Sequence, residues 1–406
     1  MSDQKEKSGY AFGSAGFLPQ EEMLEIGKKK KQLLIGIPKE NKKYESRVGL
    51  TPEAVEILVN NGHEVIIEKN AGKAANYVDT NYSENGAQIV DNKEELYQCD
   101  IILKVAPPNI EEIGLFRNNQ VLLSSLNFPS QNEEYIRKLM QKKITAISFE
   151  RLKDEDNCYP VVRSMSEIAG TTSILIASEY LSNVNEGKGV MLGAVSGITP
   201  TEVVILGAGT AAEYAARAAL GLGAFIKVFD FSVTKLKRLQ TNLSTNLFTS
   251  VFHPRVMEKH LKSADVVIGA MHMGESGPKF LITEDMVRDM KKGAVIIDLS
   301  IDQGGCIETS ECRNHSDPVY KKHNVIHYCV PNIASRVART ASIALSNVFS
   351  PLLLNIADAG GVQKLLKDDS GLRHGVYIYN GILTNSHIGN YFGIPSKDIE
   401  LLMAAF

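Results

Sequence analysis

The sequence has no tryptophan, few cysteines and no long uninterrupted apolar run. The five cysteines form an odd set without C-x-x-C spacing, which disfavours both a disulfide framework and a structural zinc site. These cysteines are Cys99, Cys158, Cys306, Cys312 and Cys329. No stretch is apolar for long enough to predict a transmembrane helix, and the first twenty residues lack the apolar region of a secretory signal. We therefore expect free thiols, no metal site and a soluble, cytoplasmic protein.

The chain also lacks an excess of charge of either sign. Its 44 Lys and Arg residues nearly balance 47 Asp and Glu residues, and the pI is about 6.3. No basic field favours nucleic acid, so a small-molecule partner is expected. The one basic cluster, residues 28–31, follows a polar stretch and predicts a flexible extension over residues 1–32. The 406 residues are enough for about two domains.

Short apolar segments alternate with helical patterns from Leu33 onward. We expect helices over residues 51–62 and 135–143, the first with Thr51 as its cap and Pro52 at its first position. Strands are expected over residues 33–38, 63–72, 83–90, 100–105, 120–126 and 144–150. Strands separated by helices indicate a mostly parallel, doubly wound α/β sheet.

A second α/β unit follows a long apolar helix at residues 164–184. Its strands are expected at residues 203–206, 225–230, 265–271 and 294–300. The remaining chain, residues 338–406, has a strongly helical pattern. It is either a third domain or a helical return onto the first domain. We favour the return onto the first domain.

A dinucleotide fingerprint opens the second unit, where residues 203–212 read VVILGAGTAA. Gly207 permits the tight turn, Gly209 lets the backbone approach a pyrophosphate, and Ala212 allows close packing of the helix. Asp230 ends the next strand, where a carboxylate accepts bonds from ribose hydroxyls and repels a 2′-phosphate. The pattern favours NAD over NADP; an FAD site, an S-adenosylmethionine site and a turn that binds nothing remain open.

Two further polar clusters follow apolar strands. Asp302, with Gln303 and two glycines, ends the strand at residues 294–300, where ligands bind in open α/β sheets. A tight surface turn is the alternative there. Asn332 and two arginines lie in residues 327–342, ahead of the last helices.

Together these motifs resemble the alanine dehydrogenase and pyridine nucleotide transhydrogenase family. The matching stretches are IGIPKE (35–40), RVGLTPEAV (47–55), HEVIIEKNAG (63–72), DIILKV (100–105), MSEIAG (165–170), VVILGAG (203–209), SIDQGG (300–305) and HYCVPN (327–332). The resemblance implies a substrate domain of residues 33–160 and 338–406, completed by C-terminal helices. An NAD domain of residues 161–337 would be inserted in it, and the subunits would form dimers or hexamers.

The resemblance also implies a reaction and its residues. Alanine dehydrogenases reversibly oxidise L-alanine to pyruvate and ammonia with NAD. Arg47 would pair with the substrate carboxylate, although an ordinary salt bridge is its alternative, and Asp302 would lie at the reacting centre. The cofactor-binding residues would be Ser166, Gly207, Gly209, Thr210, Ala211, Ala212, Asp230, Lys235, Met271, Asp302 and Asn332.

The sequence departs from the family at two positions. Ala106 stands where alanine dehydrogenases have the substrate-binding lysine of a KVKEP-like motif, and Asn127 replaces their catalytic histidine. An amide cannot act as an acid with a pKa near 7. Lys104 either replaces the missing lysine or is a structural partner of a carboxylate. Further candidates for the vacated roles are Arg163, Arg336 and His327.

Two other functions therefore remain open. The local KVxxP pattern and the PSQN run at residues 129–132 resemble a transhydrogenase component, which would exchange hydride with another nucleotide-binding protein. Loss of both the lysine and the histidine would also fit an NAD-binding protein without catalytic activity.

Overall fold

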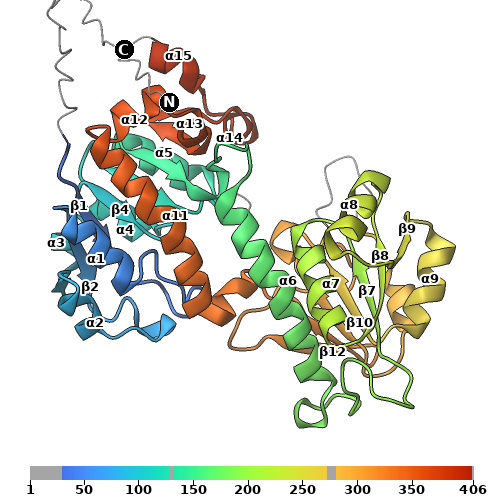
Figure 1. Cartoon of the computed structure of the whole chain (residues 1–406). Coiled ribbons are helices and arrows are strands. Elements are labelled where there is room, and N and C mark those ends of the chain that lie inside the picture. Colours follow the sequence, from blue (N-terminus) through green and yellow to red (C-terminus); the bar gives the residue numbers. More distant parts are fainter. Residues whose placement is uncertain (1–29, 128–130, 272–279, 405–406) are drawn as a thin grey trace, which may run out of the picture.

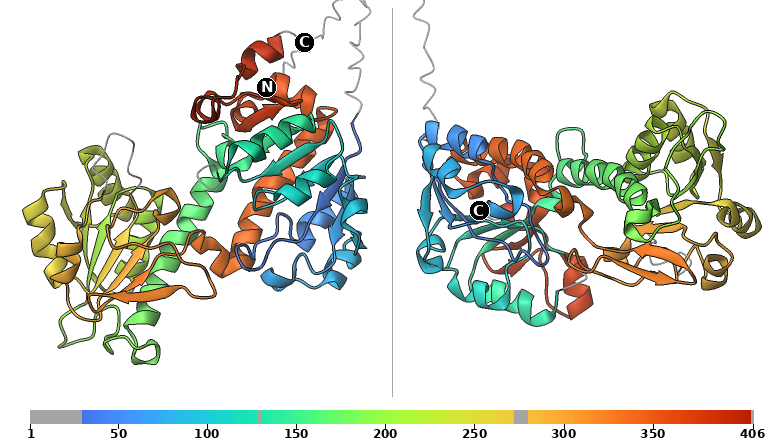
Figure 2. Two further views of the ribbon diagram at one scale, coloured as in Figure 1. Left: turned by 180° about the vertical axis from the view of Figure 1, so that it is seen from behind. Right: turned by 90° about the horizontal axis from the view of Figure 1, so that it is seen from below.

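Two α/β bodies lie side by side in the computed structural model, which describes residues 30–127, 131–271 and 280–404 (Figure 1). The long helix α6 (Pro160–Leu181) leaves the first body and packs along the second. The chain returns through η6 (Ile333–Val337) into α11 (Ala338–Asp358), which lies on the first body (Figures 1 and 2). The fold class is α/β with doubly wound sheets, as predicted.

The first sheet has eight strands in the order β15-β14-β6-β5-β4-β1-β2-β3. The strands are β1 (Leu34–Ile37), β2 (Glu64–Glu68), β3 (Gln88–Val90), β4 (Ile101–Leu103), β5 (Val121–Ser124), β6 (Thr145–Ser148), β14 (Val376–Tyr379) and β15 (Ile382–Leu383). Strands β1 to β6 are parallel, and the last two are antiparallel. The helices and turns between them are α1 (Pro52–Asn60), η1 (Lys73–Ala75), α2 (Asp79–Glu84), α3 (Lys93–Leu96), α4 (Ile110–Leu115), α5 (Glu133–Gln141) and η3 (Phe149–Arg151).

Local sequence explains where these elements begin. The Thr51 side chain accepts from the Ala54 amide and caps α1, and Pro52 occupies the first turn as predicted. The strand expected over residues 83–90 is too long, because Gly86 (φ 86°) ends α2 and only Gln88–Val90 pair with β2.

The second sheet has seven strands in the order β12-β13-β11-β10-β7-β8-β9. They are β7 (Glu202–Leu206), β8 (Phe225–Phe229), β9 (Phe248–Ser250), β10 (Val266–Gly269), β11 (Val295–Asp298), β12 (Val319–Lys322) and β13 (Val325–Tyr328). All pairs except β12–β13 are parallel, and the strand order reverses between β7 and β10. A reversal of this kind opens a crevice at the carboxyl ends of the strands, where dinucleotides bind. The helices are η4 (Asn183–Asn185), α7 (Thr210–Gly221), α8 (Val233–Leu243), α9 (Pro254–Ser263), α10 (Glu284–Arg288) and η5 (Ile301–Gln303).

The C-terminal residues complete the first body. Leu345, Phe349 and Leu353 of α11 are fully buried in the same apolar core as β1 and β4. This supports the predicted return and not a third domain. The helical segment Ile333–Asp358 is long and apolar enough to cross a membrane by composition, but half of its apolar 18-residue window is buried in the fold. The remaining helices are α12 (Val362–Asp368), α13 (Ser370–Gly375), α14 (Ser386–Phe392) and α15 (Ile399–Ala404).

The C-terminal residues add two strands to this body besides the expected helices. Strands β14 and β15 form a hairpin that extends the first sheet beyond β6. Asn380 (φ 48°) and Gly381 (φ 82°) form its two-residue turn, and an Asn-Gly pair between apolar residues is a strong hairpin signal. The five cysteines are free, as expected. Residues 1–29 lie outside the described residues, so the flexible extension stays a prediction, as do the exact domain boundaries.

Candidate nucleotide and substrate site

The glycine turn between β7 and α7 has the shape that its sequence predicts. Gly207 has φ 106°, and a Cβ there would lie 2.4 Å from the Ala270 carbonyl oxygen, so only glycine fits. A Cβ on Gly209 would meet no atom within 4 Å, which leaves open space beside the turn. Gly209 also provides no side chain to cap α7. The first amides of α7 and the open space together fit a phosphate group.

Asp230 lies directly beside this turn. It follows β8 and is 4% exposed, and its two carboxylate oxygens accept from the amides of Ala208 (2.7 Å) and Ser232 (2.8 Å). Each carboxylate oxygen has a second lone pair, so both can still accept from ribose hydroxyls. The structure therefore brings Asp230 and the glycine turn together at the carboxyl end of the second sheet.

The other predicted NAD contacts belong to elements around the same crevice. Thr210 and Ala211 are in the first turn of α7, and Ala212 is fully buried behind it. Lys235 is exposed in the first turn of α8, whereas Met271 is 8% exposed after β10. Ser166 lies on α6, which contacts α7. Their contacts with NAD stay predictions.

Close packing of α6 on α7 depends on a glycine. A Cβ on Gly170 would lie 2.2 Å from the Ala211 carbonyl oxygen. The MSEIAG motif therefore contains one residue that the helix crossing requires. This contact fixes the N-terminus of α7 relative to the interdomain helix.

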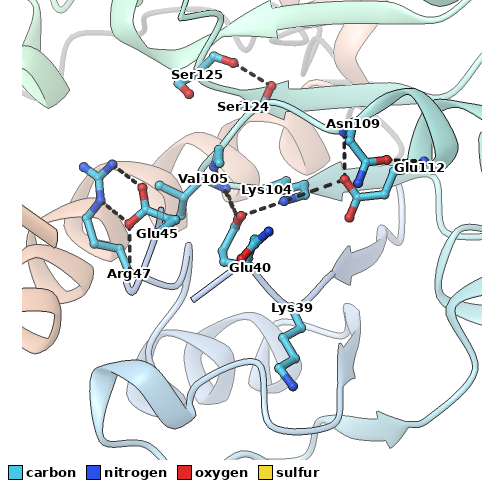
Figure 3. A network of polar contacts seen from close by, with 12 residues as sticks. Lys39, Glu40, Glu45, Arg47, Lys104, Val105, Asn109, Glu112, Ser124 and Ser125 are labelled. Carbon is cyan, nitrogen blue, oxygen red and sulfur yellow. Dashed lines mark hydrogen bonds and ion pairs between the residues drawn. The ribbon is translucent and has the colours of Figure 1, made fainter. Parts of the chain in front are cut away.

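Arg47 and Glu45 form a buried, bidentate pair at the carboxyl edge of the first sheet (Figure 3). Arg47 Nε lies 2.8 Å from Glu45 Oε1, and Nη2 lies 2.7 Å from Oε2. Burial opposes ionisation of Glu45, but the guanidinium outweighs it and lowers the pKa of that carboxyl. This side-on pairing leaves the end-on Nη1/Nη2 edge of the guanidinium for another carboxylate. Nη1 also lies 3.2 Å from Sδ of Met165, at the start of α6.

The same glutamate connects the two bodies. Asn332 Nδ2 donates to Glu45 Oε2 over 2.7 Å, and Ser335 Oγ donates to Oε1 over 3.1 Å. Asn332 has a left-handed backbone (φ 60°), which asparagine tolerates well. Glu45 therefore holds both Arg47 and Asn332, the second of which is a predicted NAD contact.

Asp302 belongs to the second body, and the charge of Glu150, which belongs to the first body, acts on it. Asp302 lies in η5, after β11, and its side chain is exposed to solvent. The surrounding protein atoms, and then the charge of Glu150, raise the pKa of Asp302. Glu150 follows β6 and accepts from the Leu126 amide over 3.2 Å. Asp302 is therefore accessible from solvent, and a carboxyl in the field of a second carboxylate holds its proton more tightly.

Lys104 lies just beyond β4 and is buried, with 4% of its side chain exposed. Its Nζ is 2.6 Å from Glu40 Oε2 and 3.9 Å from Glu112 Oε2 (Figure 3). Burial lowers the pKa of Lys104, but Glu40 and Glu112 outweigh burial and raise it, so Lys104 remains an ammonium. Burial also raises the pKa of Glu40 to about 7, against the opposite effect of Lys104.

Glu40 has a second contact, with the backbone next to Lys104, which indicates a structural reason for the lysine. Its Oε1 accepts from the Val105 amide over 2.6 Å, so the carboxylate covers the end of β4. The geometry favours the structural alternative for Lys104, in which the ammonium orients Glu40. Direct action of Lys104 on a substrate stays an untested prediction.

Ala106 and Asn127 follow the neighbouring strands β4 and β5 at the same sheet edge. The further candidates for the vacated roles lie on other elements. Arg163 is exposed and 3.3 Å from Glu167, and Arg336 is paired with Glu179. His327 is fully buried and forms a hydrogen bond with Thr309 over 2.8 Å, and burial lowers its pKa to about 4. A side chain buried in this way cannot contact a substrate.

Three glutamates of the site were missed from the sequence, although each lies in or near a stretch that drew attention. Glu40 ends the IGIPKE motif, Glu45 precedes Arg47 by two residues, and Glu150 ends the strand-like segment at residues 144–150. A carboxylate two residues before a predicted substrate arginine could have been predicted to pair with it. The influence of Glu150 on Asp302 could not be predicted from the sequence, because the two residues are far apart in it.

Comparisons with known proteins cover nearly the whole chain. Residues 36–169 match the profile described as alanine dehydrogenase/PNT, N-terminal domain, and residues 173–386 match its C-terminal domain. An alanine dehydrogenase of Staphylococcus saprophyticus is 38% identical over 91% of this chain and 99% of its own. Alanine dehydrogenase 2 of Staphylococcus aureus is 37% identical over 90% of this chain and 98% of its own.

Solved structures give the same outline. An L-alanine dehydrogenase superposes with a TM-score of 0.82 at 34% identity, covering 88% of this chain and 99% of that one. A transhydrogenase from Sinorhizobium meliloti superposes with a TM-score of 0.73 at 23% identity, over 87% of this chain and 99% of that one, and shows the shared fold alone.

Proposed function

Because the chain belongs to the alanine dehydrogenase/PNT family, we propose that it is an NAD-dependent oxidoreductase that converts L-alanine to pyruvate and ammonia, reversibly. The observation that carries the proposal is the built nucleotide crevice. Gly207, the open space at Gly209 and the fixed Asp230 lie together at the strand-order reversal.

The residues of the crevice would hold NAD as follows. The amides of Gly209, Thr210 and Ala211 would bind the pyrophosphate, and Asp230 would accept from the ribose hydroxyls. When bound, NAD supplies the hydride acceptor, and the protein contributes binding, orientation and exclusion of water.

Arg47 would bind the carboxylate of the amino acid through its free end-on edge. Glu45 would contribute by fixing the plane of the guanidinium, because both of its oxygens hold Arg47. A carboxylate bound bidentately has one preferred orientation, which positions the substrate Cα in the cleft.

Asp302 and Glu150 would supply the negative charge that faces the amino group. An ammonium or iminium group beside two carboxyls is stabilised, and a raised pKa makes Asp302 a better proton acceptor than an ordinary aspartate. In this arrangement no cation is needed at position 106 and no imidazole at position 127. Lys104 and Glu40 would support the sheet edge and not contact the substrate.

Steady-state kinetics test the proposal. Purified protein with NAD and L-alanine at alkaline pH should produce NADH, and Arg47→Lys should raise KM for alanine far more than it changes KM for NAD. Lys42→Arg is a suitable control, because Lys42 is an exposed cation of the same loop. NAD binding without turnover of alanine or other 2-amino acids would instead support a non-catalytic member. Hydride exchange between nucleotides alone would support a transhydrogenase-like component.

A cytoplasmic location stays a prediction from the sequence composition, and assembly into dimers or hexamers stays a prediction from the family resemblance. Sedimentation of the full-length protein measures the second directly.

A further inference from the structure

A cavity of about 630 Å³ lies at the junction of the two bodies, apart from the nucleotide crevice. Ser46 and Asn76 of the first body line it, with Tyr180 and His315 of the second and Arg336 and Arg339 of the connecting segment. Its lining includes neither the glycine turn nor Asp230, Asp302 or Arg47. Its volume is within the range of about 300–1,000 Å³ typical of small-molecule sites.

The charge of the lining is positive. Two arginines contribute to it, and none of the described residues that line it is acidic. The cavity is also bordered by the first residues of α11, a 21-residue helix whose N-terminus has no side-chain cap among the described residues. A helix N-terminus adds partial positive charge to that of the arginines.

Arg339 has donors to spare. Among the described residues, its guanidinium donates to one acceptor, the Asn76 carbonyl, over 2.8 Å. Its position is fixed by the Tyr77 ring, whose centroid is 4.3 Å away. A guanidinium held on an aromatic face, with most of its five donors available, is well prepared to bind an oxyanion.

Arg336 also lines the cavity and is oriented differently. It is paired with Glu179 and lies 5.6 Å from the Tyr328 ring centroid. The side chain of Glu179 is partly exposed, so an anion that enters the cavity competes with a solvated partner and not with a buried one. The rings of Tyr180 and Tyr328, 6.0 Å apart, add flat apolar surface beside the arginines.

We propose that this junction cavity binds a phosphate-bearing small molecule, with Arg336 and Arg339 as its phosphate ligands. Arginine pairs recognise phosphate through bidentate hydrogen bonds, and the tyrosine rings accommodate the rest of such a molecule. The site is separate from the proposed NAD and amino-acid sites and does not depend on the reaction.

Occupancy of the cavity would affect both bodies. The Ser46 amide donates to Ser335 Oγ over 2.8 Å, and the Ser335 hydroxyl donates to Glu45, which holds Arg47. A ligand that contacts Ser46 and Arg336 together therefore stabilises one position of η6 relative to the first body. Binding would be linked to the position of Arg47 through this short chain of bonds.

The test is calorimetric titration of the full-length protein with pyrophosphate and, separately, with inorganic phosphate. Both titrations are performed with NAD present, so that the glycine turn does not contribute, and at constant ionic strength. We expect saturable binding of pyrophosphate, weakened at least tenfold in Arg339→Gln. Arg255→Gln is the matched control, because Arg255 is an exposed arginine of α9 outside the cavity, and the affinity of this variant should stay within twofold of wild type.

A second variant removes space and leaves the charge. Ala74 lines the cavity and is half-buried, so Ala74→Phe should abolish binding while both arginines remain. This variant decides the matter if Arg339→Gln does not fold. Absence of saturable binding of either probe to wild type, unchanged affinity in both cavity variants, or an equal loss in Arg255→Gln would overturn the proposal.

Discussion

The buried pair of Lys104 and Glu40 gives the sharpest prediction, because it separates a structural lysine from a catalytic one. Lys104→Met leaves Glu40 buried with its amide donors but without its ammonium. Removing one partner of a buried ion pair costs about 3–5 kcal/mol of unfolding free energy. We expect a loss of this size at pH 8, where the Glu40 carboxyl of the wild type is mostly ionised.

The loss should depend on pH with a defined sign. Glu40 has a folded pKa of about 7, raised by burial from 4.5, so the folded state holds this proton more tightly than the unfolded state between those values. The contribution of Glu40 to stability therefore falls as the pH rises through this window. Without Lys104 the folded pKa rises further, so the gap between variant and wild type widens above pH 7, by at most about 1.4 kcal/mol per unit.

Glu40→Gln and the double variant complete a thermodynamic cycle. The new amide oxygen at position 40 would still accept from the Val105 amide, and the thioether at position 104 would need no counter-charge. The double variant should therefore be more stable than the sum of the single losses by at least about 2 kcal/mol. Lys69→Met is the control, since Lys69 and Asp91 form an exposed pair at 2.9 Å and such pairs are worth less than about 1 kcal/mol.

The assay is urea unfolding followed by circular dichroism and by tyrosine fluorescence, because the chain has no tryptophan. Turnover of the double variant then distinguishes the roles of Lys104. A stable double variant with near wild-type turnover supports the structural role. If the double variant is stable but inactive while Glu40→Gln alone is active, Lys104 is assigned to catalysis. If each single variant loses less than about 1 kcal/mol, the reasoning about the buried pair is refuted.

Three other changes have defined outcomes. Asp230→Ala should weaken NAD binding about tenfold or more by calorimetry, since a hydrogen bond to a charged group contributes about 1.5–3 kcal/mol, and unchanged affinity would contradict the ribose assignment. Gly170→Ala should lower the melting temperature and the NAD affinity by separating α6 from α7, whereas Gly221→Ala, with no atom within 4 Å of its Cβ, should not. Glu150→Gln removes a charge that raises the pKa of Asp302, so the acid limb of the kcat/KM profile should shift to lower pH. An unshifted limb would show that Asp302 is not the group that titrates there.

Much of the fold could be predicted because local signals and burial agree. The segment VVILGAG combines an apolar strand with glycines, and its strand, turn and helix follow as expected. The hairpin at Asn380 and Gly381 was missed, although its turn is a strong signal, because the surrounding residues had a helical pattern. Strand β3 is shorter than expected since Gly86 ends a helix that the apolar pattern did not predict.

The site was harder to predict because its geometry depends on distant contacts. Arg47 and Asp230 could be identified from motifs, but the orientation of Arg47 depends on Glu45, which also contacts Asn332, 287 positions later in the chain. The influence of Glu150 on the pKa of Asp302 depends on how the two bodies are arranged, which the sequence does not contain. The role of Lys104 likewise needed the position of Glu40, 64 residues earlier.

Hydride transfer from the amino acid is the central claim, and isotope transfer measures it most directly. L-alanine deuterated at Cα is incubated with NAD and the full-length protein, and the reduced nucleotide is analysed by mass spectrometry. The proposed function predicts NADH that carries deuterium at the nicotinamide, formed together with one equivalent each of pyruvate and ammonia. NADH without deuterium, or no NADH although NAD binds, would contradict it.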